Sequence, residues 1–231
     1  MNDQSGKTLE SMSQATWYNR WIKNQFSQYL SGEILEIGCG IGNFSSHLAN
    51  YGNLTAIDIN KSYMKEANKK MGNRVSVGFG DIEKGKFFFK KRVFDTVVCL
   101  NVLEHIKDDK KALKNIYELL APGGILILLV PMHRFLFNLI DQSINHFRRY
   151  EKNELKEILR NNNFEIFKIK NLNFLGSIGW FIAGTLFKDR QISEGKIKIF
   201  NLISPIFLFL ENIIEPPFGT SLLVVARKKS K

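Results

Sequence analysis

Cysteine is nearly missing from this sequence of 231 residues, which contains only Cys39 and Cys99. Each lies in a short apolar segment with the character of a buried strand, so a framework of disulfides is excluded. We expect both thiols to be small packing groups. A chain of this kind suits the reducing cytoplasm.

A long uninterrupted apolar run is also missing. Residues 1–14 are polar and lack the apolar segment of a secretory signal. Residues 171–187 carry no charge, and residues 199–210 form a second uncharged run that Pro205 interrupts. A transmembrane helix needs about 20 apolar residues. We therefore expect these two runs to form buried or interfacial helices.

Acidic residues are scarce beside basic ones: 22 Asp and Glu stand against 33 Lys and Arg, a net charge of +11. This surplus favours an anionic partner, such as a phosphorylated metabolite, nucleic acid or an acidic membrane surface. The basic residues occur in short groups, such as 148–149 and 227–229, without one stretch that interleaves them with aromatic side chains. That distribution disfavours nucleic acid.

What the sequence does contain is a regular alternation of apolar segments and amphipathic helical patterns. The predicted strands are residues 34–37, 54–58, 75–79, 94–100, 125–130, 164–170 and 221–227. Helical patterns lie around residues 17–30, 43–49, 64–71, 112–120 and 155–159. The alternation predicts an α/β fold with right-handed βαβ units and a mostly parallel, doubly wound sheet. Residues 171–220, which we call the apolar insertion, depart from it.

Three glycines, Gly38, Gly40 and Gly42, follow the first predicted strand and precede the first helical stretch of the core. Glycine lets the backbone approach a ligand closely, and the N-terminus of the following helix offers unpaired N–H groups. A tight strand-to-helix turn without a ligand would also use glycine. The loop alone therefore leaves both readings open.

Two aspartates favour the ligand-binding interpretation. Asp58 ends the second predicted strand, 20 residues after Gly38, where a carboxylate can accept hydrogen bonds from both ribose hydroxyls of an adenosine. Asp81 follows the third predicted strand and is placed to accept a hydrogen bond from an adenine amino group. The alternative for each is an ordinary turn or helix-capping residue.

The segment 34–42 resembles the first motif of the class I S-adenosylmethionine-dependent methyltransferases, because Glu36 precedes a G-x-G-x-G loop. Segments 101–106 and 120–124 are similar to that family's later motifs. The resemblance implies an enzyme with S-adenosylmethionine as cofactor, the loop along its methionine part and Glu36 near its amino end. The implied cofactor-binding residues are Glu36, Gly38, Cys39, Gly40, Gly42, Asp58, Ile59, Asp81, Ile82 and Asn101.

The same resemblance implies a Rossmann-like sheet that ends in an antiparallel strand hairpin, formed here by residues 164–170 and 221–227. We expect one domain over residues 1–231, as its length suits a single α/β unit. Its parts would be an N-terminal helical segment (1–32), a cofactor-binding core (33–170), the apolar insertion as a helical lid (171–220), and a last strand with a basic tail (221–231).

Methyl transfer requires an acceptor atom held about 3 Å from the methyl carbon, opposite the sulfur. A hydroxyl or carbon acid gains from a general base, and His105 and His146 are the candidates. Residues 145–150 resemble a pattern in a methyltransferase subgroup linked to cell-envelope glycan and isoprenoid pathways. That likeness implies His146 and Tyr150 at the acceptor and Arg149 holding an anionic group on it.

Structural roles compete with these assignments. In the alternative, Arg148 and Arg149 cap and brace the following helix, His146 fills a surface site, and His105 only orients the loop around the cofactor. Glu104 and His105 also resemble part of a Glu-x-x-Glu-His pattern in a metal-using minority of the family. Asn101 stands where the first glutamate would be, which removes a charged ligand, so we predict no metal.

The sequence thus predicts methyl transfer to a small-molecule, lipid-, isoprenoid- or glycan-linked acceptor, with oxygen, nitrogen and carbon all open as the acceptor atom. Apolar helices in a basic chain favour a hydrophobic acceptor and a peripheral position on the anionic inner membrane face. One alternative is a cofactor-binding regulatory or scaffold protein without catalysis. The other, a nicotinamide-dependent oxidoreductase, is disfavoured because Asn43 stands where G-x-G-x-x-G would continue.

Overall fold

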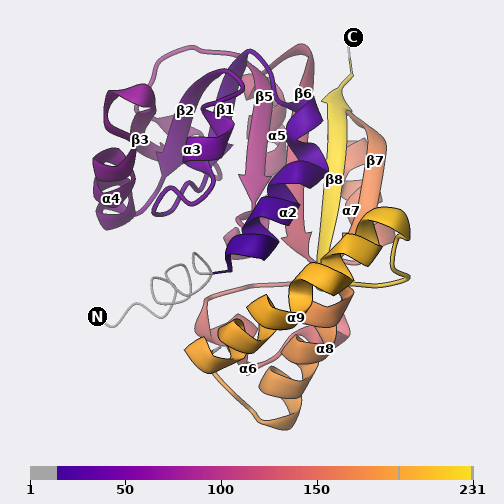
Figure 1. The fold of residues 1–231 in the computed structure, drawn as a ribbon. Helices are drawn as coiled ribbons and strands as arrows, with labels where there is room; N and C mark the ends of the chain where they lie inside the picture. The colour runs from indigo at the N-terminus through magenta and orange to yellow at the C-terminus, as the bar shows by residue number, and fades with distance from the viewer. Residues whose placement is uncertain (1–14, 192, 230–231) are drawn as a thin grey trace.

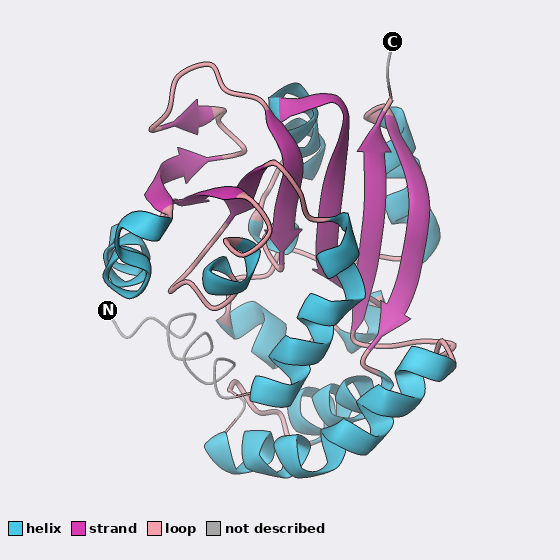
Figure 2. Cartoon of the chain, turned by 45° about the horizontal axis from the view of Figure 1, so that its top comes forward, coloured by secondary structure: helices cyan, strands magenta, loops and turns pink. Residues whose placement is uncertain are grey.

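The computed structural model describes residues 15–191 and 193–229, which form one mixed sheet covered by helices on both faces (Figures 1 and 2). Within this part of the chain the strand order is β4-β3-β2-β1-β5-β6-β8-β7. The strands are β1 (Glu33–Ile37), β2 (Asn53–Asp58), β3 (Ser76–Asp81), β4 (Lys86–Phe87), β5 (Phe94–Leu100), β6 (Leu120–Pro131), β7 (Phe164–Leu172) and β8 (Ser221–Lys228).

The centre of the sheet is parallel, since β1 pairs with β2 and β5, β2 with β3, and β5 with β6 in that sense. At one side β8 pairs antiparallel with both β6 and β7. The predicted α/β fold, with a doubly wound, mostly parallel sheet and a terminal antiparallel pair, is therefore confirmed. The strand order reverses between β1 and β5, which is where open α/β sheets place their ligands.

Helices and short helical turns connect the strands. They are α2 (Thr16–Phe26), η1 (Ser27–Tyr29), α3 (Ser45–Leu48), α4 (Lys61–Met71), η2 (Gly72–Arg74), η3 (Leu103–His105), α5 (Asp109–Leu119), η4 (Arg134–Leu136), α6 (Leu139–Ser143), α7 (Lys152–Asn161), α8 (Phe174–Phe181), the π-helical turn η5 (Ile182–Leu186) and α9 (Glu194–Ile213).

Two apolar clusters hold the helices to the sheet. Leu113 of α5 and Leu155 of α7 pack on one face, whereas Ile22 of α2 and Leu208 of α9 pack on the other. The central strand β6 is buried from Leu126 to Pro131, as its continuous apolar sequence predicts for a strand covered on both sides. The sheet is thus a rigid platform for the loops at its ends.

The helices α8 and α9, with η5 between them, connect β7 to β8 and belong to the apolar insertion. Figure 1 shows α6, α8 and α9 together beyond the end of the sheet to which β5 and β6 point. Among the described residues, no helix combines the length and the hydropathy that crossing a membrane requires. As Figure 1 shows, the helices of the insertion lie beside the edge of the sheet at which the strands of the parallel core end.

Candidate active site

The glycine loop is a tight turn between β1 and α3. Gly38, Gly40 and Gly42 have φ angles of +70°, +52° and +82°, values that favour glycine over residues with a Cβ. At Gly38 an added Cβ would lie 2.3 Å from Cγ2 of Val102. The backbone N–H of Gly38 donates to the carbonyl oxygen of Ile57 at 2.8 Å. The loop therefore has the close-fitting glycine backbone that a bound cofactor requires.

Asp58 ends β2 and turns its carboxylate toward this loop. Its Oδ2 accepts a hydrogen bond from the backbone N–H of Gly40 at 2.9 Å, and its Oδ1 accepts one from Asn60 at 2.8 Å. Burial raises the pKa of Asp58, against the effect of these two bonds. Each oxygen keeps a further lone pair for another donor, so the carboxylate is fixed in place and can still bind a pair of hydroxyls.

Glu36 is the second carboxyl group at the loop. It is buried at the end of β1, and the hydroxyl of Ser45 donates to its Oε2 at 2.5 Å. Burial raises the pKa of Glu36 to about 8; the bond from Ser45 works against the shift, and the nearby Asp58 carboxylate adds to it. A buried carboxyl group of this kind gains strongly from a cationic partner, such as the ammonium group of a methionyl ligand.

The remaining residues predicted for the cofactor lie around this centre. Cys39 is buried in the loop, Ile59 is exposed beside Asp58, and Ile82 is buried after β3. Asp81 ends β3; burial would raise its pKa, but hydrogen bonds from Lys84 hold the pKa below its usual range. Asn101 follows β5 with φ of +53° and is exposed. Glu36, the loop and Asp58 are thus brought together, whereas Asp81 lies at the outer strand β3.

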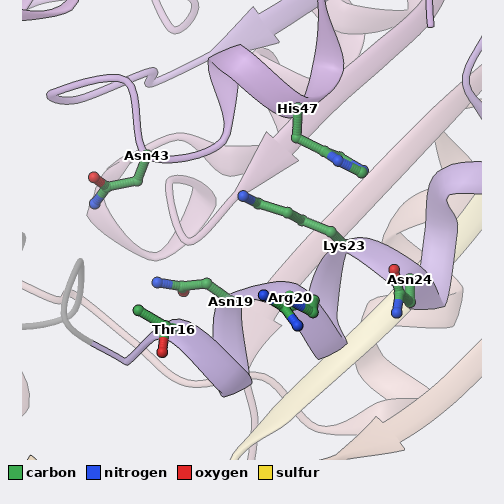
Figure 3. Close-up of a pocket in the computed structure, with 7 residues that line it drawn as sticks. All are labelled: Thr16, Asn19, Arg20, Lys23, Asn24, Asn43 and His47. Atoms are coloured by element: carbon green, nitrogen blue, oxygen red, sulfur yellow. The ribbon is translucent and has the colours of Figure 1, made fainter. Parts of the chain in front are cut away.

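A hollow of about 400 Å³ lies beside the loop, between α2 and α3. Figure 3 shows the Lys23 side chain extending from α2 into it. Its lining is basic and polar, without a carboxylate: Thr16, Asn19, Arg20, Lys23, Asn24, Asn43 and His47. Sequence reasoning missed these residues, although Arg20 and Lys23 follow one another at helical spacing.

The two candidate histidines meet at the carboxyl end of β5. The rings of His105 and His146 pack edge to face with centroids 4.6 Å apart. Nδ1 of His146 lies 2.9 Å from Oδ1 of Asp141, and Nδ1 of His105 lies 3.3 Å from the carbonyl oxygen of Asn145. Although His105 keeps contact with solvent, desolvation of its ring and the nearby His146 lower the pKa of His105 to about 4.

Glu104 is a site residue that sequence reasoning left without a role. It is fully buried, and neither carboxyl oxygen has a hydrogen-bond partner among the described residues. Oε1 lies 3.8 Å from Nε2 of His146. Burial raises the pKa of Glu104 to about 7, against the charges of His146 and Arg149. Ligand atoms of Glu104, His105 and His146 lie within 4.8 Å of one another; the absence of metal remains a prediction.

Arg149 and Tyr150 make their polar contacts inside the protein. Nε of Arg149 donates to Oδ1 of Asp141 at 2.9 Å, and its Nη1 donates to the carbonyl oxygen of Met132 at 3.2 Å. The hydroxyl of Tyr150 donates to Oδ2 of Asp109 at 2.9 Å. Both side chains are almost fully buried. This arrangement favours a structural role for both side chains over direct contact with an acceptor, but the partners of Arg149 lie in α6 and after β6 rather than in the following helix α7.

A glycine loop at the point where the strand order reverses, followed by a carboxylate on the next strand, defines a Rossmann-like binding site for an adenosyl cofactor. A model of the methyltransferase domain family matches residues 35–128, the part of the chain that carries this site. The residues present also fit S-adenosylmethionine, since Gly38 has no room for a Cβ and Glu36 is a buried carboxyl group that lacks a cationic partner at hydrogen-bond distance among the described residues.

Curated relatives agree with that match. The chain is similar to ubiquinone biosynthesis O-methyltransferase of Rickettsia prowazekii, with 30% identity over 171 residues that make up 66% of each protein. It is also similar to juvenile hormone acid O-methyltransferase of Bombyx mori, with 30% identity over 52% of this chain and 45% of the relative. The matched part therefore spans about two thirds of the first relative and less than half of the second.

Solved structures agree in fold. An S-adenosylmethionine-dependent methyltransferase from Clostridium acetobutylicum superposes with a TM-score of 0.60 at 14% identity, over 93% of this chain and 92% of that one. The chain belongs to the class I S-adenosylmethionine-dependent methyltransferases. It is an enzyme of that class, and S-adenosylmethionine is its cofactor.

Proposed function

We propose that this methyltransferase modifies an oxygen atom of an apolar, lipid-linked small molecule at an anionic membrane surface. The observation that carries the proposal is the position of His146, whose Nδ1 is held by Asp141 beside an insertion with an apolar exterior. An imidazole held in this way offers Nε2 as a base. The two relatives described above are both named as O-methyltransferases, which supports oxygen as the acceptor atom.

On the cofactor side, we assign Asp58 to the ribose hydroxyls and Glu36 to the ammonium group. The loop of Gly38, Cys39, Gly40 and Gly42 would lie along the methionine part, and Asn101 would lie near the sulfonium. Ile59, Asp81 and Ile82 would surround the adenine. The basic hollow with Arg20 and Lys23 is suited to the carboxylate of the same ligand, because it adjoins the loop through Asn43 and no carboxylate lines it.

When bound, S-adenosylmethionine supplies a methyl group on a positively charged sulfur, which is already activated for in-line displacement. The part of this chain is to hold the acceptor hydroxyl in line and to receive its proton at Nε2 of His146. His105 packs against that ring and would shield it from water. Arg149 and Tyr150 would act by bracing the segment that carries His146, as their buried hydrogen bonds indicate.

The lipid part of the proposal depends on the surface of α8, η5 and α9, which we call the exposed apolar face. At Leu202 and Ile206 the residues are 79% and 67% exposed. Large apolar patches on a soluble domain mark interaction sites, and basic residues beside them attract anionic lipid. By this name we mean the exposed apolar side chains of these elements and of the residues that follow them, namely Ile178, Phe181, Leu186, Phe187, Ile199, Leu202, Ile206, Phe209, Ile213 and Ile214; Lys188, Arg190, Lys196 and Lys198 lie on the same segment.

The acceptor can be found with cofactor that carries carbon-13 in its methyl group. The protein is incubated with separated lipid, soluble and macromolecular extracts, and we expect label in the lipid fraction with the chemical shift of a methoxy carbon. Label on nitrogen or carbon would overturn the oxygen assignment, and label in protein or nucleic acid would overturn the small-molecule assignment. No label in any fraction, despite cofactor binding, would favour a cofactor-binding scaffold.

Co-sedimentation with vesicles tests the membrane surface independently. We expect binding to anionic vesicles that falls as salt rises and that weakens in Ile206→Ser. The matched control is Val93→Ser, which also removes an exposed β-branched side chain but lies before β5, outside the exposed apolar face. Equal binding by both variants, or no binding to anionic vesicles at low salt, would reject membrane association.

A further inference from the structure

Asp141 is a fully buried carboxylate at which three separate parts of the chain meet. Its Oδ1 accepts hydrogen bonds from Nδ1 of His146 and Nε of Arg149, each at 2.9 Å. Its Oδ2 accepts bonds from Nε1 of Trp180 and the backbone N–H of Asn138, each at 3.1 Å. The donors come from the start of α6, the segment before α7, and α8 of the apolar insertion. Four donors saturate both oxygens.

The carboxylate is held in its ionised form by these partners. Burial alone would raise its pKa, but the hydrogen bond from His146 and the charge of Arg149 prevail and hold the pKa of Asp141 below its usual range. An ionised carboxylate at Nδ1 keeps the proton on that nitrogen and leaves Nε2 as an acceptor. The state of the imidazole therefore depends on the orientation of this side chain at Nδ1, beside the influence of Glu104, whose Oε1 lies 3.8 Å from Nε2.

Trp180 connects the same carboxylate to the apolar insertion. Besides its bond to Asp141, its indole ring lies 4.9 Å from the guanidinium carbon of Arg149. Its carbonyl oxygen accepts a hydrogen bond from Nδ2 of Asn138 at 3.3 Å. Asn138 is also packed against η5, because a Cβ added at Gly184 would lie 2.2 Å from it. The seat of α8 on α6 is thus built from several contacts around one polar network.

The terminal torsion of an aspartate is broad, and the two oxygens of its carboxylate are equivalent, so hydrogen bonds decide the plane in which the carboxylate lies. At Asp141 the bonds from Trp180 and Asn138 occupy Oδ2 and leave Oδ1 for His146. If α8 leaves its position, Oδ2 loses its only side-chain donor, while the N–H of Asn138 and the guanidinium of Arg149 still bind the carboxylate. The hydrogen bond to His146 then loses part of its geometric support.

We propose that Asp141 is a positioning residue that couples the seating of α8, through Trp180, to the orientation and tautomer of His146. The apolar insertion would then do more than cover an acceptor, because its closure would complete the base. This inference rests on the proposed function in one respect, the role of His146 toward the acceptor. The coupling itself does not involve the acceptor and can be measured in the protein without it.

The deciding variant is Trp180→Phe. It keeps an aromatic ring beside Arg149 and removes the N–H that bonds to Asp141, together with the volume of one ring. Trp17→Phe is the matched control, since Trp17 is an exposed tryptophan on α2 that does not contact the network. Asp141→Asn is the stronger change, but it leaves the buried charge of Arg149 without its partner and can impair folding; Trp180→Phe then decides alone.

The readout is the tautomer of His146 in full-length protein labelled with nitrogen-15 at histidine, measured by long-range proton–nitrogen NMR correlation. We expect the proton on Nδ1 in the parent and in Trp17→Phe. In Trp180→Phe a population protonated at Nε2 should appear, and in Asp141→Asn it should dominate. An unchanged tautomer in Trp180→Phe would overturn the coupling, whatever happens to folding stability.

Turnover separates the coupling from the proposed function. Once an acceptor is known, Trp180→Phe should lower kcat about 10-fold, the scale of one lost hydrogen bond to a charged group, with the KM for S-adenosylmethionine unchanged. A shifted tautomer with normal kcat would support the coupling and overturn the base role of His146. A lowered kcat with an unshifted tautomer would overturn the coupling.

Discussion

The cofactor edge and the proposed acceptor side of this enzyme are built by different means. At the cofactor edge the site is formed by the backbone, because glycines adopt positive φ angles and a backbone N–H group binds Asp58. On the acceptor side buried side chains hold one another, as Asp141 does with His146 and Arg149. A site made by backbone depends on residues near in sequence, whereas one made by side chains gathers distant segments.

The comparison predicts that damage to the two sides can be separated, and His146→Ala gives the largest expected effect. Loss of a positioned base lowers turnover by about 10²–10⁴-fold, while affinity for S-adenosylmethionine should stay within twofold. Steady-state kinetics and calorimetry measure the two quantities. A parallel loss of cofactor affinity would show that cofactor binding and the environment of His146 are energetically coupled.

Gly38→Ala should act on the backbone-built side and lower the free energy of unfolding by about 2–5 kcal/mol, the sum of left-handed strain and overpacking. Gly42→Ala is the control, because its φ is also positive but its added Cβ meets its nearest neighbours at an ordinary 3.6 Å. It should cost only the strain, about 1–2 kcal/mol. Equal losses in denaturant unfolding would refute the close approach to Val102.

Asp58→Ala should weaken S-adenosylmethionine binding by about 1.5–3 kcal/mol, the range for lost hydrogen bonds to a charged group. The fold should remain, since the two groups that donate to Asp58 are backbone N–H groups in turns. Calorimetry with a circular-dichroism control decides the matter. Full affinity in a folded Asp58→Ala protein would remove this carboxylate from the ribose site.

A subtler effect concerns the proton on Glu36. With a pKa of about 8 in the free protein, this carboxyl group is mostly protonated at pH 7. An ammonium group nearby favours the ionised form, so binding should release close to one proton, and affinity should rise as the pH approaches 8. Calorimetry in buffers of different ionisation enthalpy counts the proton. Glu36→Gln should release none; proton uptake by the parent protein would contradict the assignment.

The smallest expected effect is that of a chelator, which should change methyl transfer less than about twofold. Asn101 replaces a charged ligand, and the charge of Arg149 already acts on Glu104, so the pull on a cation is reduced. Activity lost on chelation and restored by a divalent ion would instead assign Glu104, His105 and His146 to a metal. That result would change the chemistry of the acceptor side alone.

The strands were predicted well where an apolar run was bounded by clear turn residues, and less well elsewhere. The segment 94–100 coincides with β5, whereas β6 begins at Leu120 and not at 125, because Leu120 pairs with Phe94 ahead of an irregular register. The two-residue strand β4 was missed since so short a segment shows no periodicity. A local sequence pattern reports the preferences of neighbouring residues, but it does not report pairing with a strand that is distant in the sequence.

The candidate site divides in the same way. Glu36, Gly38 and Asp58 were found because a short motif places them at successive strand ends. Asp141 was not singled out by any sequence pattern, and in the structure it also caps the first turn of α6. Its bond to Trp180 joins residues 39 positions apart, and that of Tyr150 to Asp109 spans 41. Neither periodicity nor a short motif predicts hydrogen bonds between side chains that lie this far apart in the sequence.

The two ends of the apolar insertion have a consequence for how such enzymes diversify. Leu172 closes β7 and Ser221 opens β8, and these two residues face each other as partners in the antiparallel ladder. A segment that leaves and returns at paired positions can change in length and composition without disturbing the register of either strand. The register alone would allow exchange of residues 173–220, but Leu208 packs under the sheet and Trp180 bonds to Asp141, so any replacement has to preserve or rebuild these two contacts.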